Sequence, residues 1–263
     1  MTGVAARDAA GAALNTEAFP RFFRIAGYPV NSYKVFLCIG CYVAILTSTL
    51  VGLASGLSPL ALGFGLLAFA LLGMVGARAY HLVTHPDLYV RRGFTLTARG
   101  GNEGGWSVLG GLIIVPVSLL FDTILGIPIG VFWDHMAIAI AVGGAFIRFG
   151  CVCNGCCVGR ESSAWFALRQ HDVNLVTKRR VPTQWLEIGW WVLAWVGLFW
   201  LWPMELPGGS YAFAVLGWYG LGRLWLETLR EQIATVTGVR VDQAVAAVLA
   251  LGGAAGLALK LFA

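Results

Sequence analysis

Charge is scarce in this sequence. Asp, Glu, Lys and Arg make up 12% of its 263 residues, whereas a soluble domain carries about 25% charged residues. Apolar runs recur along the whole length, 58% of the residues are hydrophobic, and the mean hydropathy is +0.77. The composition therefore excludes a soluble fold with one anchor and indicates an integral membrane protein.

Several other patterns are missing. The first 33 residues lack the charged, apolar and small-residue order of a cleavable signal peptide, and their stretch RFFRIAGYPV is expected to lie on the membrane surface. No apolar run alternates with period two, so helices rather than a closed barrel satisfy the backbone in lipid. No basic run contains interleaved aromatic residues, and the net charge of +5 is typical of lipid contacts. Nucleic acid is therefore not an expected partner.

Windows of about 20 apolar residues predict seven membrane-spanning helices. The expected fold class is all-α, a polytopic integral membrane protein. It has an N-terminal interfacial segment at residues 1–33 and one seven-helix membrane domain at residues 34–263. Pro116 and Asp122 interrupt the third span. The predicted spans are residues 35–55, 57–78, 108–128, 132–150, 185–203, 210–229 and 242–262.

The charges that do occur are divided unevenly between the two sides of the membrane. Loops 79–106, 159–184 and 230–241 carry nearly all of them, and all three lie on the N-terminal side. The positive-inside rule would place this side in the cytoplasm. Alternatively, the arginines serve an active site, in which case their number says little about topology.

Two charged residues lie inside the sixth predicted span. Arg223 and Glu227 are four residues apart, so they share one helical face, and Arg230 follows about a turn later. In one interpretation the pair neutralises itself while Arg230 reaches the membrane interface. In the other the charges mark a functional site, because a charge at membrane depth is costly.

Arg148 ends the fourth predicted span, and Gln184 and Glu187 of the stretch PTQWLE begin the fifth. We expect these side chains to reach the same face as Arg223 at similar depth. Several guanidinium groups beneath a lipid head group form a phosphate site, because the guanidinium fork matches phosphate oxygens. Arg78, at the end of the second span, is either a further contact or only a terminal anchor.

The stretch RFGCVCNGCCVGR, residues 148–160, contains four cysteines. It is a tight turn of small residues, a metal or redox site, or a place where a neighbouring arginine lowers the pKa of a reactive thiol. Zinc motifs usually separate their ligand pairs by a longer loop, and no histidine lies within ten residues. We therefore expect no metal ion and no other cofactor. The cysteines are Cys151, Cys153, Cys156 and Cys157.

The histidines offer no catalytic pair. All four lie at or near span ends or in loops, and none has a partner at a spacing that indicates catalysis. They are expected to be surface or interfacial residues. They are His81, His85, His135 and His171.

Six segments, in order over most of the chain, resemble motifs of the prolipoprotein diacylglyceryl transferase family of bacterial membrane enzymes. They are FRIAGYPVNSYKVFLCIG, GARAYHLV, EGGWSVLGGLIIV, WDHMAIAIAVGGAFIRFGCVCNGCCVGR, VPTQWLE and YGLGRLWLETLRE. The resemblance implies a multi-pass protein of the bacterial inner membrane with phosphatidylglycerol and a prolipoprotein signal peptide as partners. It implies that a cysteine thiol attacks the glyceryl carbon, a thioether forms, and glycerol phosphate leaves.

The resemblance also implies roles for single residues. Arg148 and Arg223 handle the phosphate and stabilise charge on the leaving group, and Glu227 orients Arg223. The predicted catalytic residues are Arg148, Arg223, Glu227, Tyr33, Cys151 and Cys156. The predicted substrate-binding residues are Asn154, Gly159, Gln184, Glu187, Arg78, Arg160 and Arg230.

The sequence departs from the family at several of these motifs. Leu109 and Val181 stand where the family carries histidines, so the obvious proton acceptor is missing. Cys151 and Cys156 stand where many members carry Asn and Glu, and Ile147 replaces a glycine. The phosphate-binding half of the site is kept, and the half that activates the acceptor is altered.

Three functions follow from this pattern. The first is the family activity, with the acceptor proton passing to water, to Cys151 or to a substrate group. The second keeps the lipid donor but transfers its glyceryl-lipid group to a small molecule or another lipid, because both histidines are lost. The third is a non-catalytic membrane protein that binds a lipid or a metal on the same scaffold.

Overall fold

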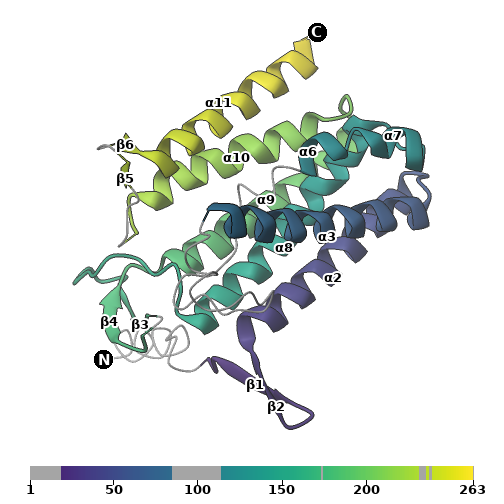
Figure 1. Ribbon diagram of the computed structural model, residues 1–263. Coiled ribbons are helices and arrows are strands. Elements are labelled where there is room, and N and C mark those ends of the chain that lie inside the picture. Colours follow the sequence, from purple (N-terminus) through teal and green to yellow (C-terminus); the bar gives the residue numbers. More distant parts are fainter. Residues whose placement is uncertain (1–18, 85–113, 173, 231–234, 237–238, 263) are drawn as a thin grey trace, which may run out of the picture.

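Helices make up most of the computed structural model, which describes residues 19–84, 114–172, 174–230, 235–236 and 239–262 (Figure 1). The long helices are α2 (Ser32–Ala54), α3 (Pro59–Thr84), α8 (Ile129–Asn154), α9 (Thr183–Leu201), α10 (Ser210–Glu227) and α11 (Val241–Phe262). The short ones are α6 (Ile114–Val117), α7 (Leu120–Leu125) and the 3-10 helix η2 (Trp202–Met204).

Helix α8 is the central element. Its apolar window is 61% buried inside the protein, against at most 22% for the other candidate spans. One side of α8 packs around Phe132 against α2, α3 and α7. Its other side packs against α9 and α10, where Trp191 and Tyr211 are buried. The first half and the middle of α8 are therefore held from two directions.

Helix α2 packs closely on α8 because its buried face carries a small residue at every fourth position. Such residues let helix backbones approach each other in lipid. Ser48 adds a hydrogen bond of 2.7 Å from its Oγ to the carbonyl oxygen of His135 on α8. The other small residues of this face are Gly40, Ala44 and Gly52.

The mostly helical membrane fold predicted from the sequence is confirmed, but the number of spans is not. Within the described residues, five helices are long and apolar enough to cross a membrane: α2, α3, α8, α9 and α11. Helix α10 has 18 residues and contains Arg223 and Glu227, which lower its hydropathy. The protein is therefore a multi-pass membrane protein.

The predicted third span, residues 108–128, is not one helix over its described part. It contains the short helices α6 and α7. Pro116 has no backbone N–H, and the Ser118 hydroxyl donates to the carbonyl oxygen of Val115 at 2.6 Å, so the helix does not continue. Gly126, at φ 65°, then ends α7. Residues 108–113 lie outside the described part of the chain.

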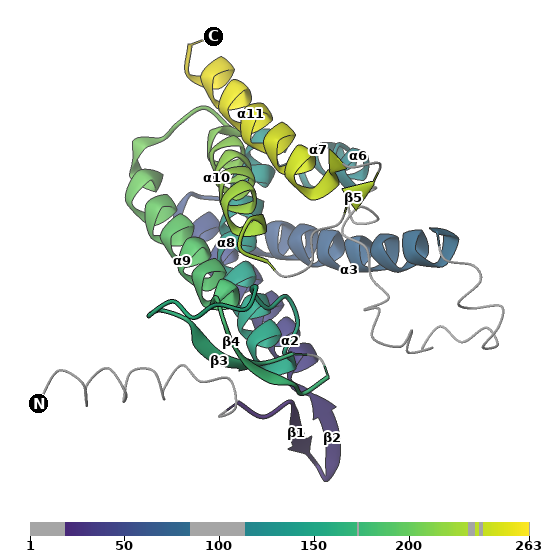
Figure 2. The ribbon, with the colours of Figure 1, turned by 90° about the vertical axis from the view of Figure 1, so that its left-hand side faces the viewer.

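The described part of the chain contains three antiparallel hairpins that the sequence did not predict. The first precedes α2, the second lies between α8 and α9, and the third lies between α10 and α11. They are β1 (Phe22–Ile25) with β2 (Tyr28–Asn31), β3 (Leu168–His171) with β4 (Thr177–Arg180), and β5 (Thr235–Val236) with β6 (Val239–Arg240). The first two hairpins lie at the same end of the helix bundle (Figures 1 and 2).

The described part of the expected interfacial segment forms the first hairpin. Ala26 and Gly27, at φ 49° and 83°, form its turn. Phe22, Ile25 and Tyr28 expose more than half of their surface, as a segment against lipid head groups would. Residues 1–18 of that predicted segment lie outside the described residues.

Helices α10 and α11 run side by side in opposite directions (Figure 1), and glycines set their separation. A Cβ on Gly253 of α11 would lie 2.7 Å from the carbonyl oxygen of Phe213 on α10, even closer to Gly217. No side chain larger than hydrogen fits there without moving a main chain.

Gly253→Ala is expected to lower the free energy of unfolding by about 1–3 kcal/mol, the usual cost of overpacking. The neighbouring Gly252 has no atom within 4 Å of a Cβ position, so Gly252→Ala is the matched control and should cause no loss. Thermal unfolding of the two purified variants in detergent measures the difference. Equal unfolding temperatures would contradict the close contact between α10 and α11.

Candidate active site

The carboxylate of Glu187, near the start of α9, lies at the centre of a cluster of arginines. Its Oε2 is 2.7 Å from Arg148 Nε at the end of α8. Its Oε1 lies 3.4 Å from Arg223 Nη1 on α10 and accepts a 2.8 Å hydrogen bond from Arg230 Nη2. The side chain of Glu187 is 4% exposed. One buried carboxylate thus joins three guanidinium groups from three parts of the chain.

Glu227 is the second acidic residue of this cluster. Its Oε2 lies 2.8 Å from Arg223 Nη2 and 3.8 Å from Arg230 Nε. The pair of Arg223 and Glu227 expected from the i,i+4 spacing is therefore formed. It does not neutralise itself in isolation, because Arg223 also faces Glu187. Three guanidinium groups against two carboxylates leave one positive charge in the cluster.

An aromatic pocket adjoins this cluster between α9 and α10. Trp190 and Trp218 stack with ring centroids 4.1 Å apart, and each indole N–H donates to the other's carbonyl oxygen at 3.0 Å. A Cβ on Gly222 would lie 2.7 Å from Trp190 Cδ1, so glycine is needed there. The free volume of this pocket is only about 10 Å³, roughly the space that one water molecule needs. Its lining residues are Arg148, Glu187, Trp190, Trp191, Tyr219, Gly222, Arg223 and Leu226.

The side chain of Gln184 fixes the turn that contains the cysteines. Its Nε2 donates to the carbonyl oxygens of Cys156 at 2.7 Å and Cys151 at 3.3 Å. Its Oε1 accepts from Gln170 Nε2 at 3.0 Å. The hydroxyl of Thr183 donates to the carbonyl oxygen of Cys157 at 3.0 Å. Gln184 therefore binds the protein's own turn rather than lying open to a substrate.

Three of the four thiols converge at this turn. The Sγ atoms of Cys151, Cys156 and Cys157 all lie within 4.8 Å of one another, and Arg148 Nη1 is 4.0 Å from Cys151 Sγ. Hydrogen bonds from the Cys151 and Cys156 thiols lower the pKa of Cys157, and the charges of Arg148 and Arg230 lower it further. Cys153, at 1% exposure, lies apart from this group.

Asn154 and Tyr33 connect the turn to the start of α2. Asn31 Nδ2 donates to Asn154 Oδ1 at 3.1 Å, and Asn31 Oδ1 caps α2 by accepting from the backbone N–H of Tyr33. The phenol of Tyr33 lies close enough to Cys151 and Arg148 to interact with them electrostatically. Tyr33 therefore lies beside the cysteine turn.

Gly159 and Arg180 continue the turn into the hairpin of β3 and β4. A Cβ on Gly159 would lie 2.9 Å from Thr183 Cγ2 and closer still to the carbonyl oxygen of Val181. The backbone of Gly159 pairs with Arg230. Arg180, 2% exposed, donates to the Gly159 carbonyl at 3.5 Å and lies 3.6 Å from Asp172 Oδ2. The basic run TKRR gave no sign in the sequence that Arg180 is buried.

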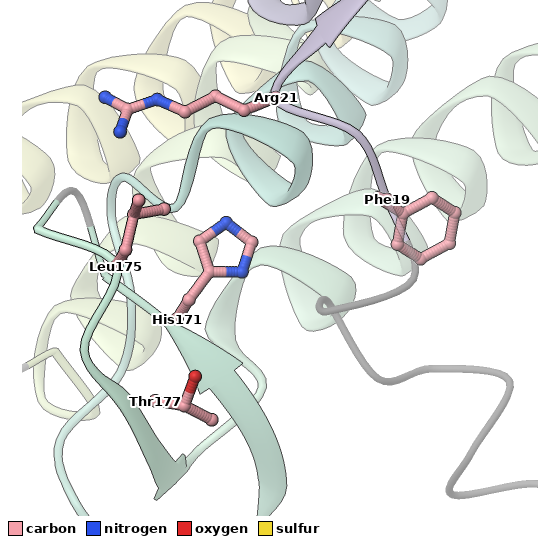
Figure 3. A pocket seen from close by; sticks show the side chains of 5 residues that line it. All are labelled: Phe19, Arg21, His171, Leu175 and Thr177. Carbon is pink, nitrogen blue, oxygen red and sulfur yellow. The ribbon is translucent and has the colours of Figure 1, made fainter.

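A second pocket, of about 260 Å³, adjoins the cysteine turn (Figure 3). It lies between the hairpin of β3 and β4 and the segment that precedes β1. His171 connects it to the turn, because a Cβ on Gly155 would lie 2.8 Å from His171 Cδ2. The lining residues are Phe19, Arg21, His171, Leu175 and Thr177.

Two predicted binding residues are not brought into the cluster. The main contacts of α3, which carries Arg78, are with α2, α6 and α7. The side chain of Arg160 is exposed, and its backbone N–H donates to the Leu229 carbonyl at 2.9 Å. Leu109, where the family histidine is expected, lies outside the described residues. Val181, the other departure, is buried.

Removing Glu187 should strongly destabilise the protein, because it leaves three nearly buried guanidinium groups short of a counter-charge. Glu187→Ala is expected to lower the free energy of unfolding by about 3–5 kcal/mol. The control is Glu161→Ala, since Glu161 forms its ion pair with Lys178 at the exposed surface and such pairs contribute little. Chemical unfolding of both variants tests this, and similar midpoints would argue against a central role for Glu187.

The sequence profile of the prolipoprotein diacylglyceryl transferase family matches residues 20–259 of this chain. Curated relatives include the phosphatidylglycerol–prolipoprotein diacylglyceryl transferases of Streptococcus pyogenes serotype M5 (strain Manfredo) and serotype M49 (strain NZ131). Each is 29% identical over 235 residues, which cover 85% of this chain and 88% of the relative. The matched range contains the arginine cluster and the cysteine turn. The chain therefore belongs to the prolipoprotein diacylglyceryl transferase family, as its motifs predicted.

Proposed function

We propose that this protein transfers the diacylglyceryl group of phosphatidylglycerol to the cysteine thiol of a prolipoprotein, in the bacterial inner membrane. The relatives are named for phosphatidylglycerol as the donor and a prolipoprotein as the acceptor. The observation that carries the proposal is the positive charge left over where Glu187 gathers Arg148, Arg223 and Arg230 at the ends of membrane helices.

A surplus positive charge in a nearly buried site needs an anion. The phosphodiester of phosphatidylglycerol carries one negative charge and offers oxygens that match the guanidinium fork.

Entry of the phosphate requires the cluster to open slightly. The aromatic pocket beside Arg148 and Arg223 is narrow, so the phosphate would take over part of the contact that Glu187 now makes with these arginines. Trp190, Trp191 and Tyr219 form an apolar wall next to it. The wall suits the glyceryl carbon and the first part of the acyl chains, which leave the pocket toward the bilayer.

The reaction breaks one carbon–oxygen bond and forms one carbon–sulfur bond. The acceptor sulfur attacks the glyceryl carbon beside the phosphate, and the bonding electrons of the broken bond remain on the phosphate oxygen of glycerol phosphate. That oxygen gains negative charge in the transition state, where Arg148 and Arg223 would stabilise it in a poorly hydrated site. The proton lost by the thiol ends on the released phosphate or in water.

One charge of the loops has a chemical reason besides the positive-inside rule. Arg230, in loop 230–241, is engaged in ion pairs with Glu187 and Glu227. Arg148 and Arg223 lie within helices, so that rule does not count them. A site on the outer side of the inner membrane would meet secreted prolipoproteins.

Arg148→Lys and Arg223→Lys should each lower turnover by roughly 10²–10³-fold, because lysine keeps the charge but loses the planar fork. Turnover is measured in nanodiscs that contain phosphatidylglycerol, by mass spectrometry of a lipidated acceptor peptide and of released glycerol phosphate. Arg179→Lys is the control, since the Arg179 side chain donates to the carbonyl oxygens of Ala164 and Ala167 at 3.3 Å, away from the cluster.

Wild-type rates in both cluster variants would contradict phosphate recognition by these arginines. Lipid analysis of cells with and without the protein distinguishes the acceptors. Diacylglyceryl-modified lipoproteins support the proposed acceptor, and a new glyceryl-lipid product without them supports transfer to a small molecule or lipid.

A further inference from the structure

The three converging thiols are placed by specific features of the backbone. Cys151 lies in the last turn of α8, and Gly155, at φ 70°, ends that helix. Cys157 then adopts φ 60°, a left-handed conformation that is unfavourable for a non-glycine residue. Strain of this kind concentrates at functional sites, where surrounding contacts maintain it. Here it brings the Cys157 sulfur back onto Cys151 and Cys156.

The surroundings hold this arrangement in place. Gln184 donates hydrogen bonds to the carbonyl oxygens of Cys151 and Cys156, and Thr183 donates to that of Cys157. Each of the three cysteines thus has its carbonyl oxygen bound by a side chain at the start of α9. Cys153, two residues after Cys151 on the same helix, faces another direction and is not part of the group.

The distances match a zinc ion with three sulfur ligands. A zinc–sulfur bond of about 2.3 Å places the sulfurs of a tetrahedral site about 3.8 Å apart, and the three Sγ atoms already lie within 4.8 Å of one another. Structural zinc sites use four protein ligands, whereas catalytic sites use three and keep the fourth position open. The three cysteines therefore correspond to a catalytic site, which has three protein ligands and one open position.

We propose that Cys151, Cys156 and Cys157 bind a zinc ion whose open fourth position takes the thiol of the acceptor cysteine. This inference rests on the proposed function for the identity of the acceptor. Thiolate ligands select zinc, copper(I) or iron–sulfur clusters. Zinc is the choice for this reaction, because thioether formation transfers no electrons to or from the metal.

The zinc ion would supply what the missing family histidine does not. A thiol that coordinates zinc is deprotonated outright, so no side-chain base is needed. The thiol proton passes to water as the acceptor binds, the zinc-bound sulfur then attacks the glyceryl carbon, and the zinc–sulfur bond breaks as the thioether forms. Glycerol phosphate leaves and takes a proton from water, so that charge and atoms balance.

Arg148 connects this site to the phosphate site. Its Nε lies 2.7 Å from Glu187, within the arginine cluster, while its Nη1 lies 4.0 Å from Cys151 Sγ. A sulfur bound at the fourth zinc position would therefore lie next to a phosphate held by the same guanidinium group. Such proximity brings nucleophile and glyceryl carbon together.

The first experiment measures metal binding directly. The full-length protein is purified under reducing conditions, stripped of metal in nanodiscs and titrated with Co²⁺, whose thiolate complexes absorb in the near ultraviolet. The expected result is a thiolate band that saturates at about one Co²⁺ per chain and is removed by Zn²⁺. Cys151→Ala, Cys156→Ala and Cys157→Ala should each weaken binding at least about tenfold. Cys153→Ala is the matched control and should bind normally.

The second experiment uses the wild-type protein alone, so that it does not depend on the folding of any variant. A prolipoprotein signal peptide that contains the acceptor cysteine is added to the Co²⁺ form of the protein, in nanodiscs without phosphatidylglycerol. A peptide with cysteine should strengthen the thiolate band as a fourth sulfur binds, and the same peptide with serine should not. Absence of Co²⁺ and Zn²⁺ binding, a band unchanged by the cysteine peptide, or a disulfide within the group in freshly reduced protein would overturn the proposal.

Failure of the zinc site and failure of the proposed function give different results. Full transfer by metal-free protein overturns the zinc proposal and leaves the transferase function intact. A thiolate band that responds to the cysteine peptide, without transfer when phosphatidylglycerol is present, upholds the metal site and contradicts the transferase function.

Discussion

The fold depends on one ionic interaction, in which the buried carboxylate of Glu187 holds guanidinium groups from α8, from α10 and from the segment that follows α10. Charges at membrane depth are tolerated only when they are paired. The ends of these helices therefore meet at Glu187. The cluster contains three guanidinium groups and only two carboxylates, those of Glu187 and Glu227. The remaining positive charge makes it suitable for a lipid phosphate.

The sequence predicts the pair of Arg223 and Glu227 but not the central position of Glu187. The pair of Arg223 and Glu227 follows from helical spacing, because residues four apart share a face. Glu187 was predicted only to line the site, since its hydrogen-bonding partners Arg223 and Arg230 lie 36 and 43 residues away in the chain. Periodicity carries no information at that separation. The membrane class followed from composition alone, whereas the break at residues 114–125 and the loop hairpins depend on hydrogen bonds that spacing does not reveal.

The cysteine run is a second case in which residue spacing does not predict how side chains come together in the structure. Its spacing does not match a zinc motif, and the sequence therefore predicted no metal. Spacing rules assume that the chain between ligand pairs is an ordinary loop. Here a helix end, a left-handed glycine and a left-handed Cys157 bring residues 151, 156 and 157 together within a very short segment. Two residues in the left-handed region thus bring three thiols together without a longer loop.

Arg148 is the residue at which the two parts of the site meet, and its geometry explains why a lysine would not replace it. The guanidinium group presents separate N–H donors along separate directions. One edge faces the carboxylate of Glu187, and another faces the sulfur of Cys151. A lysine ammonium is a single point of charge on a flexible chain, so it would pair with one of these groups and leave the other. A transferase that joins a lipid carbon to a thiol has to hold both reactants next to each other. In this protein one planar side chain at the end of α8 supplies that link.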